Sequence, residues 1–177
     1  GILGLGKIGS AVARRAKGFG MDIIYHNRHG RKIQNEKQVG AKYVSLEELV
    51  QRSDFLSLHC PLNNENYHVI NRSIFKLMKS DAYLINTARG PLVSEAHLIE
   101  ALEKKWIAGA GLDVFEKEPP SLNNKLLKMK NVVLLPHMGS ATFSTRIKMA
   151  EIAAKNILNV LDNKTPVYIT NPQVHQR

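Results

Sequence analysis

Short hydrophobic runs alternate with longer amphipathic stretches along most of the 177 residues of this sequence. This alternation is typical of βαβ units, in which helices cross between parallel strands of one sheet. The runs are almost continuously apolar, as expected for strands that are buried on both faces. We therefore predict strands at residues 2–5, 22–26, 41–44, 55–59, 82–86, 108–112 and 132–135.

Helical periodicity fills the intervals between these strands. Gly18 and Gly20 follow the first amphipathic stretch and suit the left-handed conformation that ends many helices. The run Ser45-Leu46-Glu47-Glu48 predicts a capping box, in which Ser45 accepts from the Glu48 amide and the Glu48 side chain reaches back to Ser45. The predicted helices cover residues 8–17, 45–53, 72–78, 94–105 and 145–162. The predicted fold class is α/β: a doubly wound parallel sheet in three layers, αβα.

A glycine motif directly follows the first predicted strand and opens the first predicted helix: Gly4-Leu5-Gly6-Lys7-Ile8-Gly9. Glycines at this spacing permit a tight turn, a close approach of backbone to a pyrophosphate, and close packing of helix on strand. The strand–turn–helix context predicts a dinucleotide site of the Rossmann type, contacted by Gly4, Gly6, Lys7, Ile8 and Gly9.

The second predicted strand leads to Asn27, where an NAD-specific site would place an acid that binds the ribose hydroxyls. A neutral amide does not repel a 2′-phosphate. Arg28, with Arg31 or Lys32 behind it, can donate charge-assisted hydrogen bonds to that phosphate. The sequence therefore favours NADP and leaves NAD as a second choice. The alternative is a solvated basic loop that tolerates either cofactor.

Composition narrows the class of protein. The formal net charge is +10, but the basic residues are spread along the chain and aromatic residues make up only 6%, which argues against a nucleic-acid partner. A positive field suits an anionic cofactor and carboxylate substrates. No apolar run approaches the roughly 18 to 20 residues of a membrane span, and no secretory signal is recognised. We expect a cytoplasmic protein with no membrane partner and no metal site.

Candidate ligand-binding residues follow the carboxyl ends of the later strands, where ligands sit in doubly wound sheets. Cys60 and Pro61 follow the fourth strand, and we expect them to line the cofactor site. The sequence offers no specific helper histidine that would make Cys60 a nucleophile. Arg89, after the fifth strand, is placed to grip a carboxylate through two parallel hydrogen bonds, although a single arginine is more often a structural ion-pair partner.

Acids follow the sixth strand, at Asp113 and Glu118, and His137 follows the last one. A lone histidine at such a position is most often structural. Together with Arg89, however, these groups provide what hydride transfer to a 2-keto acid requires. They supply a cation for the carboxylate, a proton donor for the carbonyl oxygen, and an acid that keeps the donor charged.

The stretches GLGKIGSAVARRAKGFGM, NTARGPLV, AGLDVFEKEPP and LLPHMGSAT resemble the signature blocks of the D-isomer-specific 2-hydroxyacid dehydrogenases, in the family's order. The resemblance extends over residues 1–172. It implies that Arg89 binds the substrate carboxylate and that His137 is the general acid in reduction and the base in oxidation. Glu118 is similar to the family's dyad carboxylate, which hydrogen-bonds to His137 and keeps it protonated.

The resemblance also implies contacts to the nicotinamide end of the cofactor. Asp113 resembles the acid that holds the carboxamide, and Thr87 and Ala88 resemble backbone contacts to the same end. Gly139, in the block of His137, is expected beside the cofactor as well.

The implied activity is reduction of a small 2-keto acid such as glyoxylate or hydroxypyruvate, by a homodimer that pairs through the cofactor domain. The alternatives are a 2-ketogluconate reductase, a phosphoglycerate dehydrogenase, a D-lactate dehydrogenase, or a corepressor that senses the nicotinamide cofactor. Asn27 and Arg28 argue against the phosphoglycerate and D-lactate enzymes and against the corepressor, because these resemble NAD binders.

The family builds its substrate domain mainly from residues upstream of the glycine motif. We therefore expect this chain to be a fragment, with residues 1–163 as the cofactor domain and residues 164–177 as a tail that leads to the substrate domain. One departure from the family is Asn63-Asn64-Glu65, which stands where Thr-Pro-Glu is common. We expect this change to be neutral.

Overall fold

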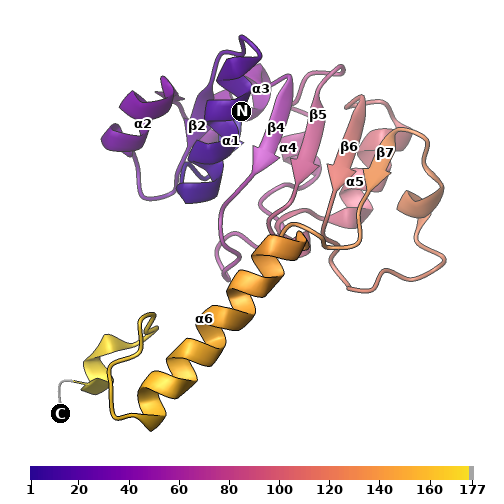
Figure 1. Ribbon diagram of the computed structural model, residues 1–177. Coiled ribbons are helices and arrows are strands. Elements are labelled where there is room, and N and C mark those ends of the chain that lie inside the picture. Colours follow the sequence, from indigo (N-terminus) through magenta and orange to yellow (C-terminus); the bar gives the residue numbers. More distant parts are fainter. Residues whose placement is uncertain (176–177) are drawn as a thin grey trace. The chain divides into compact units, whose positions relative to one another are not determined.

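A seven-stranded parallel sheet organises the computed structural model, which describes residues 1–175 (Figure 1). The strand order is β3-β2-β1-β4-β5-β6-β7, so the winding direction reverses between β1 and β4. This reversal defines a doubly wound sheet of the Rossmann type, and ligands bind such sheets at the switch point. The strands are β1 Ile2–Leu3, β2 Ile24–His26, β3 Lys42–Tyr43, β4 Phe55–Leu58, β5 Tyr83–Asn86, β6 Gly109–Leu112 and β7 Val132–Leu134.

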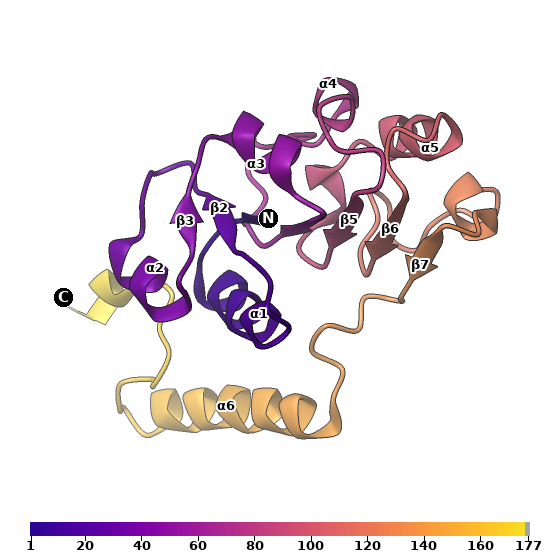
Figure 2. The ribbon, with the colours of Figure 1, turned by 90° about the horizontal axis from the view of Figure 1, so that it is seen from above.

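Helices cover both faces of the sheet (Figure 2). Helices α1 (Lys7–Gly18) and α2 (Ile33–Val39) lie on one face, and α3 (Leu46–Arg52), α4 (Arg72–Phe75) and α5 (Glu95–Glu103) lie on the other. Successive strand residues point to opposite faces, so Ile2 joins the hydrophobic cluster beneath α1 while Leu3 joins the larger cluster beneath α3–α5. The predicted three-layer α/β fold is confirmed.

The ends of α1 and α3 show how local sequence sets the helix boundaries. Gly20 adopts a φ of +73° after α1, and the amides of Gly20 and Met21 return to the carbonyls of Lys17 and Ala16. This is a Schellman ending. The left-handed conformation expected from the sequence is confirmed for Gly20, whereas Gly18 is the last residue of the helix. At α3, Ser45 accepts from the amide of Glu48, but the Glu48 carboxylate pairs with Arg52 one turn later. The predicted Ser45 cap is confirmed. The predicted return contact from the Glu48 side chain to Ser45 is replaced by the pair with Arg52.

Helix α2 was not predicted, because its sequence IQNEKQV has few apolar residues and lacks an amphipathic repeat. Its stability comes from tertiary contacts. Glu36 is buried and accepts hydrogen bonds from the Tyr25 hydroxyl and the Arg31 guanidinium, and Gly40 ends the helix in the left-handed conformation. Buried polar partners of this kind leave no periodic signal in the sequence.

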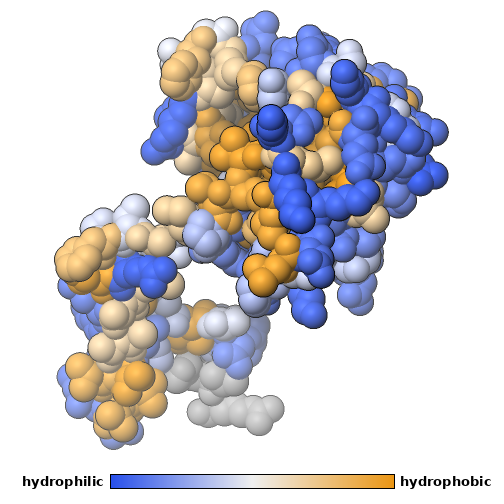
Figure 3. Space-filling model, turned by 90° about the vertical axis from the view of Figure 1, so that its right-hand side faces the viewer, coloured by the Kyte–Doolittle hydropathy of each residue, from blue (hydrophilic) through white to orange (hydrophobic). Residues whose placement is uncertain are grey.

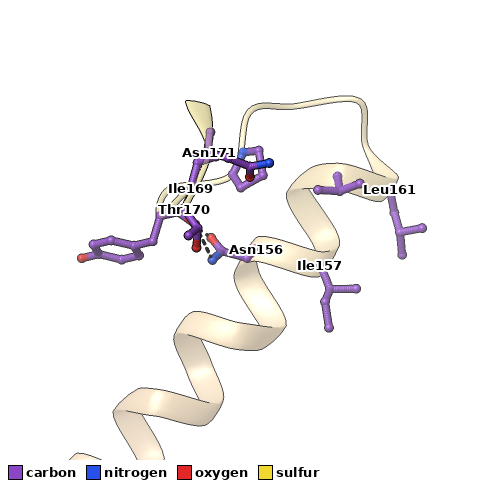
Figure 4. A pocket seen from close by; sticks show the side chains of 9 residues that line it. Asn156, Ile157, Leu161, Ile169, Thr170 and Asn171 are labelled. Atoms are coloured by element: carbon purple, nitrogen blue, oxygen red, sulfur yellow. Dashed lines mark hydrogen bonds between the residues drawn. The ribbon is translucent and has the colours of Figure 1, made fainter. Parts of the chain in front are cut away.

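A second compact unit begins at Met138, so the division falls before α6 (Phe143–Leu161) and ahead of the boundary at residue 163 expected from the sequence. Thr142 caps α6 by accepting from the Thr145 amide. The segment after the helix folds back on it (Figure 4). Asn156 donates to the Tyr168 carbonyl and accepts from the amides of Val167 and Tyr168. A cavity of about 440 Å³ lies between them, lined largely by apolar side chains.

Short 3₁₀ helices lie at Gly90–Leu92, Lys125–Lys128 and Pro172–His175. Within residues 1–175, none of the helices combines the length and hydrophobicity that crossing a bilayer requires.

Candidate active site

The turn between β1 and α1 packs so closely that two of its glycines have no room for a side chain. Gly4 has a φ of +103°, and a β-carbon there would lie 2.7 Å from the Cys60 amide nitrogen. A β-carbon on Gly9 would lie 2.1 Å from the Gly4 carbonyl oxygen. Gly6, by contrast, has no atom within 4 Å of its β-carbon position. The turn is therefore tightly packed at Gly4 and Gly9 and open to a ligand at Gly6. Backbone that receives a pyrophosphate needs both properties.

Two asparagines hold this turn through the main chain of Leu5. Asn27 Oδ1 accepts from the Leu5 amide at 2.7 Å, and Asn35 Nδ2 donates to the Leu5 carbonyl at 2.7 Å. Asn27 thus has a structural role in addition to the one expected from its place after β2. Asn35 was missed in the sequence, because it lies in the unpredicted helix α2.

A cavity of about 420 Å³ opens at the switch point between β1 and β4. The glycine turn, the ends of β2 and β4, and the loops that follow them form its wall, and most of the cofactor residues predicted near the adenosine end are there. The lining residues are Leu3, Gly4, Leu5, Gly6, His26, Asn27, Arg28, His29, Lys32, Leu46, His59, Cys60, Pro61, Asn63, Glu65, Asn66 and Val69.

The basic residues of the loop after β2 have different partners. Arg28 and Lys32 line the cavity. Arg31 instead binds Glu36 with both ends of its guanidinium, Nε to Oε1 at 3.0 Å and Nη2 to Oε2 at 2.7 Å. The sequence predicts that Arg31 or Lys32 assists Arg28 in binding a phosphate. Arg31 is paired with Glu36 of helix α2, and Lys32 lines the cavity.

Cys60 lines the cavity, and its environment does not favour a nucleophile. The residue is half-buried, and this burial raises the pKa of the thiol. A thiol held in its neutral form is a weak nucleophile. Burial also lowers the pKa of the neighbouring His59, whose ring contacts the Ser57 hydroxyl at 2.8 Å.

Asn86, at the end of β5, fixes the loop that carries Arg89. Its side chain is buried, and Oδ1 accepts from the Ala88 amide at 3.1 Å while Nδ2 donates to the Arg89 carbonyl at 2.9 Å. The Ala88 carbonyl accepts from Arg89 Nη1 at 2.6 Å. Both main-chain polar groups of Ala88 therefore have partners within the protein, whereas Thr87 is exposed at the same strand end. Sequence reasoning missed Asn86, although a buried polar residue at a strand end is a recognisable signal.

Gly90 brings the loops after β5 and β6 together. A β-carbon on this residue would lie 1.8 Å from the Phe115 carbonyl oxygen, so only glycine fits there. This contact sets Arg89 beside the loop that carries Glu118. Asp113, directly after β6, is buried, and its amide donates to the Asn86 carbonyl at 3.0 Å.

Glu118 and His137 form a hydrogen-bonded pair, as predicted, with Nδ1 of the histidine 2.6 Å from Oε2 of the acid. The other carboxylate oxygen accepts from the Phe115 amide at 3.0 Å. Partial burial acts to raise the pKa of Glu118. The hydrogen bonds from His137 and Phe115 and the positive charges of His137 and Arg89 outweigh it and hold the pKa below its usual value.

The backbone of His137 has a φ of +52°, which is uncommon for a residue other than glycine. Such conformations are concentrated at functional sites, where the surrounding structure holds them. Because Nδ1 contacts Glu118, proton exchange with a bound molecule falls to Nε2. The Arg89 guanidinium, the Glu118 carboxylate and the His137 imidazole thus lie at the same carboxyl edge of the sheet.

The other predicted contacts lie outside this group. Lys7 and Ile8 are exposed on the first turn of α1, next to the open side of Gly6. Gly139 belongs to the second unit, and its expected place beside the cofactor stays a prediction.

A tight glycine turn at the switch point of a doubly wound parallel sheet is the mark of a dinucleotide-binding domain. Comparison with known proteins gives the same class. The family model described as D-isomer specific 2-hydroxyacid dehydrogenase, NAD binding domain, matches residues 1–139. The chain belongs to the D-isomer-specific 2-hydroxyacid dehydrogenase family.

Curated and solved relatives share this domain. The chain is 53% identical over 174 residues to a glyoxylate reductase of Thermococcus litoralis, covering 98% of this chain and 52% of that protein. A glyoxylate reductase structure from Paecilomyes thermophila superposes with a TM-score of 0.87 at 41% identity, over 97% of this chain and 52% of that one. A D-lactate dehydrogenase with NAD⁺ from Lactobacillus jensenii gives 0.87 at 31% identity, over 96% and 54%. The chain thus spans about half the length of these relatives.

Proposed function

We propose that this chain is the cofactor-binding part of an NADPH-dependent reductase that converts a small 2-keto acid, of the glyoxylate or hydroxypyruvate type, into a D-2-hydroxy acid. The observation that carries the proposal is the His137–Glu118 pair beside Arg89, at the carboxyl edge of the sheet that holds the glycine turn. The names of the glyoxylate reductases that are about half identical to this chain support the substrate class.

The cofactor fits the residues that are present. The open space above Gly6 and the cavity beside it suit the pyrophosphate and the adenosine, and Arg28 and Lys32 suit a 2′-phosphate. Asn27 adds no charge that would repel this phosphate. Asp113, Thr87, Ala88 and Gly139 are proposed to meet the nicotinamide end. When bound, the cofactor supplies the hydride.

Each catalytic side chain has one proposed role. Arg89 binds the carboxylate of the keto acid with two parallel hydrogen bonds and orients the carbonyl. His137 donates a proton from Nε2 to the carbonyl oxygen as negative charge develops there, and takes it back in the reverse direction. Glu118 keeps the imidazole oriented and stabilises its charged form through Nδ1.

Homodimerisation through this domain is a further part of the proposal. On the α1 side of the sheet, Phe55, Tyr83 and Val133 are 46%, 42% and 67% exposed. Figure 3, which views the molecule from the β7 edge, shows hydrophobic residues gathered on this part of the first unit. Exposed apolar area of this kind supports a protein partner. Sedimentation of the protein should give twice the monomer mass, and a monomer at all concentrations would contradict this part.

A cytoplasmic location and a substrate domain reached through residues 164–177 complete the proposal and rest on the family resemblance.

The decisive experiment mixes the full-length protein, which includes the substrate domain, with NADPH or NADH and a panel of 2-keto acids while the absorbance of the reduced cofactor is followed. We expect glyoxylate or hydroxypyruvate to be reduced, with a higher kcat/KM for NADPH. In N27D, the carboxylate can still accept from the Leu5 amide but adds a negative charge, so the preference should move toward NADH. Activity with NADH alone would overturn the cofactor assignment, and binding of cofactor without reduction of any keto acid would indicate a sensor.

A further inference from the structure

An ion pair lies in the lining of the cavity at the switch point. Arg28, after β2, pairs with Glu65, which lies on the loop between β4 and α4. Both residues line the cavity that contains the glycine turn. Of the lining residues in the described part of the chain, 1–175, Glu65 alone is acidic. The negative charge of Glu65 therefore lies in the wall of a cavity that is otherwise suited to phosphates.

The loop holds Glu65 in position through its own asparagines. Asn63 Oδ1 accepts from the amides of Glu65 and Asn66 at 3.0 and 3.1 Å. Asn66 Oδ1 accepts from the Asn63 amide at 2.7 Å, and its Nδ2 donates to the Pro61 carbonyl at 2.7 Å. The loop is thereby tied to the end of β4. These bonds fix the main chain of Glu65, whose side chain pairs with Arg28.

The pair is suited to exchange with a stronger anion. The side chains of Arg28 and Glu65 are 48% and 71% exposed, so solvent screens their attraction and the carboxylate can turn outward. A phosphate monoester carries a charge of about −1.5 to −2 and offers three acceptor oxygens, which makes it the better partner for a guanidinium. Its binding requires the Arg28–Glu65 pair to break and leaves two anions near one another. The loss of the ion pair and the repulsion between the two anions both weaken the binding of a ligand with a phosphate at Arg28. Neither affects a ligand without that phosphate.

We propose that Glu65 is a specificity-determining residue that competes with the 2′-phosphate of the cofactor for Arg28 and so limits the preference for 2′-phosphorylated adenosines. This inference rests on the proposed function, because it takes the cavity to be the adenosine site. It adds Glu65 to the residues of that site. Glu65 is expected to lower the affinity for the 2′-phosphorylated cofactor and to leave the affinity for the unphosphorylated cofactor nearly unchanged.

The test uses a pair of ligands that differ only in the 2′-phosphate, adenosine 2′,5′-bisphosphate and adenosine 5′-monophosphate, each titrated calorimetrically into the protein at fixed salt. The variants are E65Q, R28Q and R28Q/E65Q. E103Q is the matched control, because Glu103 is also exposed and paired with a cation, Lys125, but does not line the cavity. E65Q and E103Q change the net charge equally.

E65Q should bind the bisphosphate about fivefold more tightly, the upper end of what an exposed ion pair contributes. Binding of the monophosphate should change by less than about twofold. R28Q should lose the preference for the bisphosphate, and E65Q should bring little further gain in that background. Equal gains in E65Q and E103Q, or no gain in E65Q, would overturn the role of Glu65 while nucleotide binding stands. If the unmodified protein bound neither ligand, the adenosine site itself, and the proposed function with it, would fail.

Discussion

The Nδ1 atom of His137 lies 2.6 Å from Oε2 of Glu118, and the second oxygen of the same carboxylate accepts from the Phe115 amide. The acid is therefore fixed at both oxygens, by its own loop and by a histidine that follows a different strand. This arrangement orients the imidazole with Nε2 available for proton exchange.

Replacing His137 by Gln should remove the proton donor and retain a side chain that can hydrogen-bond to Glu118. General acid–base catalysis contributes about 10²- to 10⁴-fold, so kcat for keto-acid reduction should fall by that factor. Cofactor affinity, measured by titration in the absence of substrate, should be nearly unchanged. Equal losses of kcat and of cofactor affinity would argue that His137 is structural.

Replacing Asn86 by Ala should displace Arg89 without changing the arginine side chain itself. The change removes the hydrogen bonds to the Ala88 amide and the Arg89 carbonyl at a buried position, so unfolding free energy should fall by about 1–3 kcal/mol. Because the loop that carries Arg89 is loosened, KM for the keto acid should rise more than KM for the cofactor. Urea unfolding and steady-state kinetics measure the two effects.

Asn131 is the matched control for this change, since its Nδ2 also donates to a main-chain carbonyl, that of Ala108, but at an exposed position before β7. Asn131→Ala should cost less than about 1 kcal/mol and leave both KM values unchanged. A rise in KM for the keto acid in both variants would show that the effect is general loosening of the fold.

Much of this arrangement could be predicted because its signals are local. The strands are continuous apolar runs, and the glycine turn follows one of them directly, so neither depends on distant contacts. The residues that bear charge at the strand ends could be placed at one edge of the sheet because parallel strands share that edge.

Several features that the sequence did not predict are polar contacts between residues far apart in the chain. Arg28 and Glu65 are 37 residues apart, and Leu5 and Asn35 are 30 apart. Arg31 and Lys32 are adjacent and both basic, and only the buried carboxylate of Glu36 decides which of them faces the cavity. Hydrophobic periodicity carries no information on such pairs.

Gly90 provides a steric test of how the site is assembled. A β-carbon at residue 90 would overlap the Phe115 carbonyl, so Gly90→Ala must push the loops after β5 and β6 apart. We expect a lower melting temperature and a loss of kcat/KM for the keto acid, because Arg89 and Glu118 lie on the separated loops. Gly18 is the control: it lies in α1 with no atom within 4 Å of its β-carbon position. Gly18→Ala should be neutral or stabilise by up to about 1 kcal/mol. Equal behaviour of the two variants would contradict the steric argument.

The contacts that Tyr25 and Arg31 make with Glu36 predict how stability depends on pH. Hydrogen bonds from Arg31 and Tyr25 lower the pKa of Glu36 from 4.5 to about 2. Burial, followed by the hydrogen bond to Glu36, raises the pKa of Tyr25 from 10.0 to about 12. Between pH 2 and 4.5 the unfolded chain binds the Glu36 proton and the folded chain does not, so this contribution to stability is lost as the pH falls through that window. Between pH 10 and 12 only the folded chain keeps the Tyr25 proton, so stability is lost as the pH rises.

Urea unfolding across the pH range, followed by circular dichroism, measures both limbs. Glu36→Gln should flatten the acid limb, because an amide does not titrate, and Tyr25→Phe should flatten the alkaline limb in the same way. Each variant also loses stability at neutral pH, so the diagnostic quantity is the slope of unfolding free energy against pH and not its absolute value. Glu103→Gln, which removes an exposed acid paired with Lys125, should leave the acid slope close to that of the unmodified protein. If Glu36→Gln and Glu103→Gln changed that slope equally, the helix α2 contacts would not be the source of the acid sensitivity.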